Sequence, residues 1–343
     1  MNSPEHRQWT FKSVTAVACS LALLGFGNAA AADTWRNLAP MPQGVQEIYA
    51  DVLDGLIYIG GGYTGEEPGF TDQFIAYDAA NDSWRVLARL PEARHHLTIS
   101  TVGGKIYGMG GFRGTDPRAW VLQSTMFVYD PATDSWTRGI DMPRPRGEHV
   151  APAVDGKIYA IGGRIPDASG RDGFAHYVDT SLVEMFDPES GSWTRLADAP
   201  TARNSHAAAV IDGKIYVVGG RQNQTGGGFS AINLPTLEVY DPMTDTWEKK
   251  ADMPEAQGGL AAAVLDGKLY SFGGEQWRPV QKLFATVWVY DPATDSWDSA
   301  VELPEGRHGL AAATIGAEIF AIGGADKPGA GPVNSSTALK PGA

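Results

Sequence analysis

Arginine occupies one recurring position of a repeated pattern in this chain. Each repeat contains a short two-residue turn, and in four repeats an arginine stands ten residues before the second residue of that turn. Two further arginines directly follow a Gly-Gly pair. A planar guanidinium can bind a carboxylate through two parallel hydrogen bonds. The pattern therefore predicts an anion-binding site formed by Arg94, Arg146, Arg203, Arg307, Arg164 and Arg221. A repeated arginine can equally be a structural contact within each repeat, so both interpretations stay open.

Residues that interrupt the repeat are candidates for proton transfer. Glu275 follows its Gly-Gly pair at the place where other repeats carry Arg164 and Arg221. His149 and His206 hold one position in adjacent repeats. Histidine and glutamate are common general acids and bases. We take Glu275 and His206 as candidate catalytic residues, and His149 as a candidate ligand contact.

Two tryptophans, Trp120 and Trp277, match no repeated position. Trp277 is a candidate for stacking on a sugar or anchoring a peptide, although burial of its own loop is an equal alternative. The histidines lack the close spacing of many metal sites, and the adjacent His95 and His96 would point to opposite sides of a strand. The sequence predicts neither a metal ion nor a cofactor.

Short hairpins must position these residues. HAAAVIDGKIYVVGG (206–220) and GLAAAVLDGKLYSFGG (259–274) each join two apolar runs through Asp-Gly, a strong hairpin signal. VYDPATDSW, at 128–136 and again at 289–297, adds a third strand, a turn and a fourth strand. Six tryptophans recur at steps of 49 to 57 residues. Because one such unit cannot bury both of its faces, six units predict a propeller.

The chain resembles the kelch-repeat family in its six Gly-Gly pairs, its Tyr-Asp or Phe-Asp pairs and its spaced tryptophans. The resemblance implies an all-β fold, a six-bladed kelch β-propeller of four-stranded antiparallel blades. TWRNLAP near the N-terminus would complete the last blade as its outer strand, with VNSSTAL (333–339) as the third. We expect one domain at 33–343, a partly flexible tail at 328–343, and blades at about 45–91, 94–143, 146–200, 203–254, 257–304 and 307–340 plus 33–42.

The loops that join the second and third strands should carry the binding function. They hold 14 to 22 residues, whereas the other turns on the opposite face are short and alike. Long, variable loops on a rigid scaffold commonly bind ligands. The connections between blades lie on the same face, and they carry most of the arginines and histidines named above.

Residues 1–32 are typical of a secretory signal peptide. A basic start precedes an apolar run, VTAVACSLALLGFG, that is too short to span a membrane, and small residues end near Ala32. We therefore expect an exported protein, periplasmic or extracellular. The only cysteine, Cys19, lies in this leader, so the mature chain cannot form the Cys–Tyr cofactor of kelch-type copper-radical oxidases.

The net charge of −13 disfavours nucleic acid and anionic membranes as partners. The function that we expect is a binding module for an anionic ligand: an acidic peptide, a protein or a carboxylated glycan. Two alternatives stay open. Phrases such as ELPEGRHGLAA also resemble the exported sialic acid mutarotase family, which implies a cofactor-independent epimerase or mutarotase. A structural or adhesive surface protein is the other alternative, and the sequence does not determine the oligomeric state.

Overall fold

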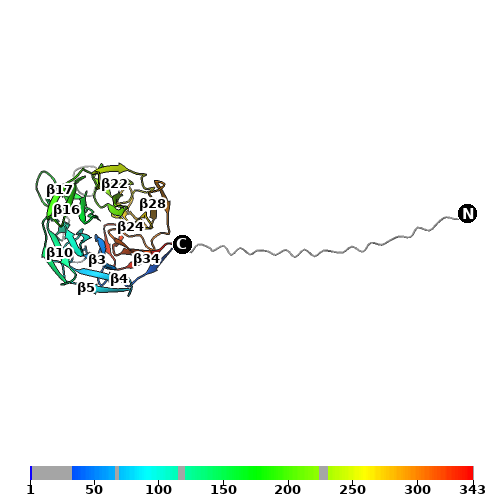
Figure 1. Ribbon diagram of the computed structural model, residues 1–343, viewed down its shortest axis with the longest axis horizontal. Helices are drawn as coiled ribbons and strands as arrows, with labels where there is room; N and C mark the ends of the chain where they lie inside the picture. Colours follow the sequence, from blue (N-terminus) through cyan, green and yellow to red (C-terminus); the bar gives the residue numbers. More distant parts are fainter. Residues whose placement is uncertain (2–32, 66–68, 115–119, 224–230, 343) are drawn as a thin grey trace.

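Six four-stranded antiparallel sheets form a closed ring (Figure 1). The computed structural model describes Met1 and residues 33–65, 69–114, 120–223 and 231–342. The expected signal peptide lies outside the described residues, apart from Met1. Within the described part, no helix is long and apolar enough to cross a membrane.

The first three blades follow one strand order, from the ring centre outward. Blade 1 contains β2 (Ala50–Leu53), β3 (Leu56–Gly60), β4 (Phe74–Asp78) and β5 (Ser83–Val86). Blade 2 contains β6 (Thr98–Val102), β7 (Lys105–Met109), β10 (Met126–Asp130) and β11 (Ser135–Arg138). Blade 3 contains β12 (Ala153–Val154), β13 (Lys157–Ile161), β16 (Val183–Asp187) and β17 (Ser192–Arg195).

The remaining blades repeat this order, and the last one joins the two ends of the chain. Blade 4 contains β18 (Ala207–Ile211), β19 (Lys214–Val218), β22 (Leu237–Asp241) and β23 (Thr246–Lys249). Blade 5 contains β24 (Ala261–Leu265), β25 (Lys268–Phe272), β28 (Val287–Asp291) and β29 (Ser296–Ser299). Blade 6 contains β30 (Ala311–Ile315), β31 (Glu318–Ile322), β34 (Ser336–Lys340) and β1 (Thr34–Asn37).

The closure of the ring confirms the fold that the sequence predicted. β1 pairs with β34, so that Trp35 lies opposite Leu339. β34 in turn pairs with β31 over Ile322↔Ser336 to Ile319↔Leu339. The N-terminal segment therefore supplies the outer strand of blade 6, and most of VNSSTAL supplies its third strand. Part of the tail for which we expected flexibility is thus an ordinary blade strand.

The repeated aromatic and aspartate residues fasten each blade to its neighbour. In blade 4, the rings of Tyr240 and Trp247 lie 5.0 Å apart. The Tyr240 hydroxyl donates to Asp245 at 2.7 Å, and the same carboxylate accepts the amide N–H of Ala197 from the preceding blade at 2.9 Å. Trp247 Nε1 donates to the Ala197 carbonyl oxygen at 3.1 Å. These contacts explain why the pattern recurs: each copy satisfies buried polar groups at an interface between blades.

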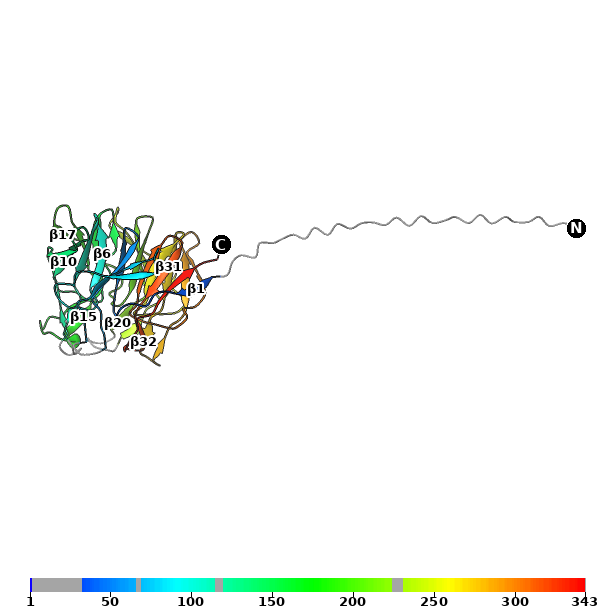
Figure 2. The same cartoon turned by 90° about the horizontal axis from the view of Figure 1, so that it is seen from below.

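Five small hairpins rise from the long loops on one face of the ring. They pair β8 (Phe112–Arg113) with β9 (Val121–Leu122), β14 (Arg164–Pro166) with β15 (Tyr177–Asp179), β20 (Arg221–Asn223) with β21 (Ala231–Asn233), β26 (Glu275–Gln276) with β27 (Lys282–Leu283), and β32 (Ala325–Lys327) with β33 (Ala330–Pro332). A 3-10 turn (Phe174–His176) precedes β15. Figure 2 shows β15, β20 and β32 together on this face, which we call the loop face.

Candidate functional site

Four predicted ligand contacts, which we call the blade arginines, lie inside the blades. Each is at most 2% exposed. Their Nη1 atoms donate to the carbonyl oxygen of the first glycine of the Gly-Gly pair in the same blade, at 2.9 to 3.2 Å: Arg94 to Gly110, Arg146 to Gly162, Arg203 to Gly219 and Arg307 to Gly323. This geometry corresponds to the structural alternative, so we do not retain the blade arginines as ligand contacts.

Carboxylates compensate the charge of three blade arginines. Arg146 pairs with Glu184 at 2.6 Å and Arg203 pairs with Glu238 at 2.5 Å, and both glutamate side chains are at most 3% exposed. Arg94 pairs with the more exposed Glu92 at 2.7 Å. Burial lowers the pKa of Arg146 to about 10, because a guanidinium charge away from water is costly. Each ion pair therefore stabilises its own blade.

A different set of residues meets above the centre of the ring. A cavity of about 70 Å³, which we call the loop-face cavity, is lined by side chains from the loops of all six blades. The residues that line it are Glu47, His96, Trp120, Glu148, Arg164, Phe174, Arg221, Ala231, Glu275, Trp277 and Gly329. The predicted candidates Arg164, Arg221, Glu275 and Trp277 are therefore together, within one small volume.

The Gly-Gly pairs bring three of these residues to the cavity. Arg164, Arg221 and Glu275 each stand directly after such a pair, as the first residue of a loop hairpin. At Gly163 the backbone φ is 86°, and a Cβ atom there would lie 2.5 Å from the Gly147 carbonyl oxygen. Only glycine permits this conformation and this close approach. The chain can therefore turn sharply from the blade toward the axis.

Ion pairs link the loop arginines, Arg164 and Arg221, to cavity glutamates. Arg164 Nε contacts the Glu148 carboxylate, and the Arg164 guanidinium lies 4.1 Å from the Phe174 ring centre. Arg221 Nη2 donates to Glu275 Oε1 at 2.8 Å. Within the described residues, Arg164 Nη1 and Arg221 Nε have no hydrogen-bond partner, although both atoms are buried. Each arginine thus has an N–H group available to an acceptor.

Two histidines, His308 and His96, contact glutamates of the cavity. His308 is 1% exposed, and its Nε2 lies 3.1 Å from the Lys327 carbonyl oxygen. Its Nδ1 lies 3.4 Å from Glu47 Oε1 and 3.5 Å from Glu275 Oε1. Burial lowers the pKa of His308, but Glu47 and Glu275 outweigh it, so the pKa is raised overall. Since both ring nitrogens face oxygen acceptors, the geometry suits a protonated imidazolium.

Glu47 connects this histidine to the other side of the cavity. His96 Nε2 lies 2.9 Å from Glu47 Oε2. Burial raises the pKa of Glu47, but His96 and His308 outweigh that effect and hold it well below its usual value. The Glu47 carboxylate therefore stays ionised between the two histidines. Glu47 comes from blade 1, which closes the ring against blade 6, the blade that contributes His308.

Trp277 contacts the cavity through Glu275. Its Nε1 donates to Glu275 Oε1 at 3.0 Å, and the backbone N–H of Gly329 donates to Glu275 Oε2 at 2.7 Å. Trp120 lies on the side of blade 2, where its ring centre is 4.3 Å from that of His95. Both tryptophans are partly buried, so each belongs to the packed wall of the cavity and also presents some surface to it.

A ring of backbone hydrogen bonds closes the propeller axis beneath this cavity. In the connection that leads into each blade, one residue adopts positive φ. These residues are Glu47, His96, Glu148, Ser205, Gly259 and Gly309. Backbone N–H groups donate to the preceding member at 2.7 to 3.1 Å in five steps: Glu47 to Gly309, His96 to Glu47, Ser205 to Glu148, Gly259 to Ser205 and Gly309 to Gly259. We call these six residues the axial ring. The side chains of Glu47, His96 and Glu148 line the loop-face cavity.

The axial ring separates two predicted site histidines from Glu275. His206 lines a central channel on the other side of the ring. Burial beside Arg203 lowers its pKa to about 3, so the imidazole is neutral. His149 is buried in blade 3, with Nε2 3.3 Å from the Thr98 hydroxyl. The expected pairing of His206 with Glu275 is therefore not formed, and neither histidine lines the cavity.

Sequence reasoning did not single out Glu47, His96 and His308 as site residues. A signal existed in the repeat itself. The axial-ring position holds Glu47, His96, Glu148, Ser205, Gly259 and Gly309, so it is the same position with a different residue type in nearly every blade. A structural position repeats its residue type, whereas a position that varies in chemistry around the axis indicates a site.

Among the described residues, no group of three or more histidine, cysteine, aspartate or glutamate side chains is arranged to hold a metal ion. Arginine and histidine neighbours already compensate the cavity glutamates. The cavity is suited instead to hydrogen bonding and proton exchange with a small polar group.

Comparisons with known proteins agree with this architecture. The Attractin/LZTR1 beta-propeller family model matches residues 31–224, which is more than half of the chain. The chain belongs to the kelch-repeat β-propeller family. A second model, the KLHDC2/KLHL20/DRC7 Kelch-repeats domain, matches residues 169–324 of this kelch propeller. Kelch propellers are a family of protein-interaction modules.

Curated relatives share only part of their length with this kelch propeller. Kelch-like protein terF of Aspergillus terreus is 36% identical over 38% of this chain and 27% of its own length. Beta-scruin of Limulus polyphemus is 33% identical over 44% of this chain and 15% of its own length. Kelch-like ECH-associated protein 1B of Danio rerio is 36% identical over 36% of this chain and 19% of its own length.

A solved structure titled "Structure of YjhT" superposes with a TM-score of 0.73. The match covers 87% of this chain and 95% of that chain at 19% sequence identity. At this identity the likeness supports the propeller fold alone, so the function must be argued from the site.

Proposed function

We propose that this kelch propeller is a recognition module that binds a carboxylate-bearing group of a protein, peptide or glycan in the loop-face cavity. The observation that carries the proposal is the pair of unused donors, Arg164 Nη1 and Arg221 Nε, buried at the cavity wall. A buried N–H group without an acceptor is unfavourable, so a ligand oxygen that accepts from it gains free energy. A carboxylate offers two such oxygens with the matching charge.

The size of the cavity supports recognition of a small terminal group rather than a whole ligand. About 70 Å³ accommodates a carboxylate and a few neighbouring atoms. The rest of a partner would lie on the loop hairpins. Ile232, beside the cavity-lining Ala231, is 45% exposed, and Val280, near Trp277, is 68% exposed. These apolar side chains favour a peptide or protein that carries apolar residues near its acidic one.

The test is a binding titration with short peptides that carry Asp or Glu between apolar residues, each beside its Asn or Gln counterpart. We expect the acidic member of a pair to bind at least about tenfold more tightly, since a charge-assisted hydrogen bond contributes about 1.5–3 kcal/mol. Arg164→Lys keeps the charge but loses the planar fork and should weaken binding. Lys105→Gln, on the opposite face, is the control. Equal affinity for acidic and neutral peptides would overturn the proposal.

A carboxylated sugar is a second candidate ligand, and one that the protein would convert as well as bind. The contact between His308 Nδ1 and Glu275 Oε1, beside Arg221, places an acid–base pair next to an anion-binding group. This favours the cofactor-independent epimerase or mutarotase alternative for sialic acid. Optical rotation of freshly dissolved sialic acid tests it: the protein should accelerate equilibration and Glu275→Gln should not. A rate equal to that of buffer disproves this alternative.

We also propose that the protein acts after export, since the basic and apolar pattern of residues 1–32 is typical of a signal peptide. N-terminal sequencing of the protein from periplasmic and secreted fractions tests this, with cleavage expected near Ala32. A retained leader would contradict it.

A further inference from the structure

The central channel is a second cavity, separate from the loop-face cavity. It has a volume of about 430 Å³ and is enclosed by the innermost strands of the six blades. Its wall begins with the residues that directly follow the axial ring, such as His206, Leu260 and Leu310, and continues along these strands. A further cavity of about 250 Å³ shares Ala50, Asp51 and Val52 and extends as far as Val264 and Thr314. The channel therefore runs from the axial ring toward the face of the short turns.

The axial ring lies between the two cavities. Its five backbone hydrogen bonds join blades 3, 4, 5, 6, 1 and 2 in succession around the axis. At the remaining step, His96 Nε2 lies 3.9 Å from Glu148 Oε1. Glu47, His96 and Glu148 line the loop-face cavity, whereas Tyr49, Thr98 and Val150, each two positions further along the chain, line the channel. The two cavities thus have no described lining residue in common.

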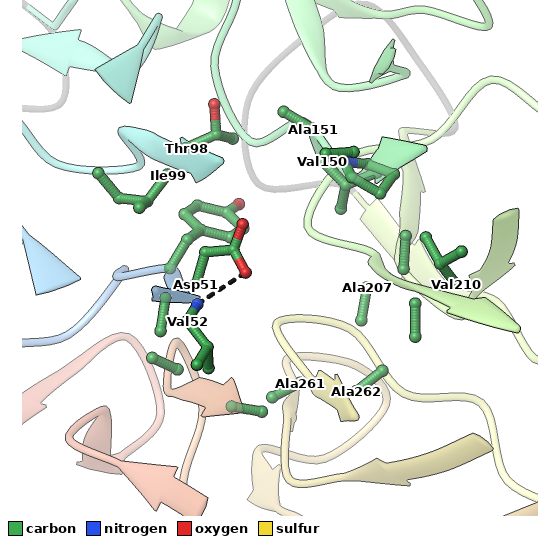
Figure 3. Close-up of a pocket in the computed structure, with 18 of the residues that line it drawn as sticks. Asp51, Val52, Thr98, Ile99, Val150, Ala151, Ala207, Val210, Ala261 and Ala262 are labelled. Carbon is green, nitrogen blue, oxygen red and sulfur yellow. Dashed lines mark hydrogen bonds between the residues drawn. The ribbon is translucent and has the colours of Figure 1, made fainter. Parts of the chain in front are cut away.

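The side chains of the channel wall are mostly small and apolar, with one charged residue among them. Alanines from five blades and the valines Val52, Val150 and Val210 form most of it (Figure 3). Asp51 of β2 is the single aspartate or glutamate on this wall, and no lysine or arginine lines it. Two other titratable side chains, Tyr49 and His206, are uncharged at neutral pH, since burial raises the pKa of the Tyr49 hydroxyl and lowers that of His206 to about 3.

The Asp51 carboxylate has no positively charged partner among the described residues. One oxygen accepts the N–H of Val52 at 2.8 Å, and the other accepts the N–H of Thr101 in blade 2 at 2.7 Å. Each oxygen therefore has capacity for a further hydrogen bond. The residue is partly exposed, and Figure 3 shows it among the alanines and valines of the channel. Burial raises its pKa, as expected for a carboxylate whose charge is uncompensated.

We propose that the central channel is a binding site for a small organic ammonium ion with a slim apolar tail. The ammonium group would donate to Asp51, and the tail would lie along the alanine-lined wall. A metal ion fits less well, because cations such as Ca²⁺ and Mg²⁺ require several oxygen ligands and the wall offers a single carboxylate.

The test is calorimetric titration and thermal unfolding of the full chain with n-hexylammonium chloride, with n-hexanol and sodium hexanoate as matched controls. We expect saturable binding of the ammonium ion alone. Asp51→Asn should weaken it at least about tenfold, because the charge-assisted hydrogen bond is lost. Ala262→Leu fills the channel without touching Asp51 and should also weaken it, which keeps the test valid if Asp51→Asn folds poorly.

Glu275→Gln and Arg164→Gln, in the loop-face cavity, serve as the separation controls. They should leave ammonium binding unchanged, while Arg164→Gln removes carboxylate binding. Three results would overturn the proposal. The first is equal binding of hexylammonium and hexanol. The second is an Asp51→Asn variant that binds hexylammonium as tightly as the unaltered protein. The third is loss of ammonium binding in Glu275→Gln, which would place the ammonium ion among the glutamates of the loop-face cavity instead.

Discussion

The blade arginines and the loop arginines are the same residue type in the same repeats, yet their hydrogen bonding differs. Arg203 donates to Gly219 and Thr236 carbonyl oxygens and pairs with Glu238 inside its own blade. Arg221 pairs with Glu275 of the next blade and lines the loop-face cavity. In the described structure Nε lacks an acceptor in both arginines, but of the two only Arg221 lies at the cavity wall. An arginine enclosed in one blade stabilises that blade, and one that reaches across blades at the cavity can also serve a ligand.

The largest expected effect is on the stability of a blade. Arg203→Met should lower the free energy of unfolding by about 3–5 kcal/mol, because it leaves Glu238 buried without its charged partner. Urea unfolding followed by tryptophan fluorescence measures it. Arg307→Met is the matched control, since among the described residues no carboxylate forms an ion pair with Arg307. It should cost less, and an equal loss would show that the carboxylate is not the cause.

The next effect distinguishes His206 from His308 by the pH dependence of stability. The folded-state pKa of His206 is lowered to about 3, so the unfolded chain binds the proton first and stability falls as pH decreases from 6.5 toward 3. The slope is at most about 1.4 kcal/mol per pH unit. The folded-state pKa of His308 is raised beside Glu47 and Glu275, so its contribution is complete below pH 6.5 and is lost as pH rises through the folded-state value.

Unfolding free energies of His206→Gln and His308→Gln between pH 4 and 9 would measure these contributions. The first variant should lose the acid-side decrease, and the second should lose part of the decrease on the alkaline side. Identical pH profiles for the two variants would contradict the environments described for these histidines.

A smaller effect separates function from stability in the loop pair. The double variant Arg164→Gln/Glu148→Gln removes both charges of this pair. Asp179, 4.0 Å from Arg164 Nε, keeps its hydrogen bonds from Asn204 and Asn223, so stability should change by only about 1–2 kcal/mol. Binding of the carboxylate ligand should nevertheless weaken at least about tenfold. Arg203→Gln/Glu238→Gln is the matched pair inside blade 4 and should bind the ligand normally. If the two double variants bind alike, the distinction between the two arginine classes is wrong.

Gly309→Ala should disturb the axial ring by about 1 kcal/mol or more, since its φ is 60° and a Cβ atom would lie 2.8 Å from the Glu47 carboxyl carbon. We expect a lower melting temperature and weaker carboxylate binding, because Glu47 would be displaced from His308. Gly316→Ala is the matched control, because it measures the cost of placing alanine at a positive φ without a steric clash. Gly316 lies in a turn of the same blade with φ 58°, and no atom lies within 4 Å of the added Cβ. Equal effects would exclude a role for the displaced side chain.

The smallest effect is expected at the exposed charges of the opposite face. Lys214 pairs with Asp241 at 3.0 Å, but its side chain is 47% exposed. Lys214→Gln should leave the melting temperature and both binding activities unchanged, because water screens such pairs. A clear loss of carboxylate binding in this variant would show that the ligand does not depend on the loop face alone.

The fold was predictable from the sequence because the same turns and strands recur in every blade. Asp-Gly turns, apolar strands and the Tyr–Asp–Trp pattern recur, and in blades 1, 2, 4 and 5 a Tyr hydroxyl donates to the same Asp position, as Tyr240 does to Asp245 in blade 4. Even the closure by residues 34–37 followed from the missing outer strand of the last blade. These properties depend on neighbours in sequence and on adjacent repeats, so the period alone specifies them.

The site was only partly predictable, because it depends on which side chains meet at the axis. The sequence indicated Arg164, Arg221, Glu275 and Trp277 and the face that carries them. It could not separate these from the blade arginines, since both kinds follow the repeat.

The amino-acid sequence by itself determined the number of blades, their strand order and the face that carries the long loops. Only the tertiary structure decided that His308 lies 3.4 Å from Glu47, 261 positions away, while His206 lies in a separate channel. The physical reason is that strand pairing and turn formation are local, whereas closure of the ring brings six distant chain segments to one axis. Their charges then compensate one another in ways that no single repeat encodes.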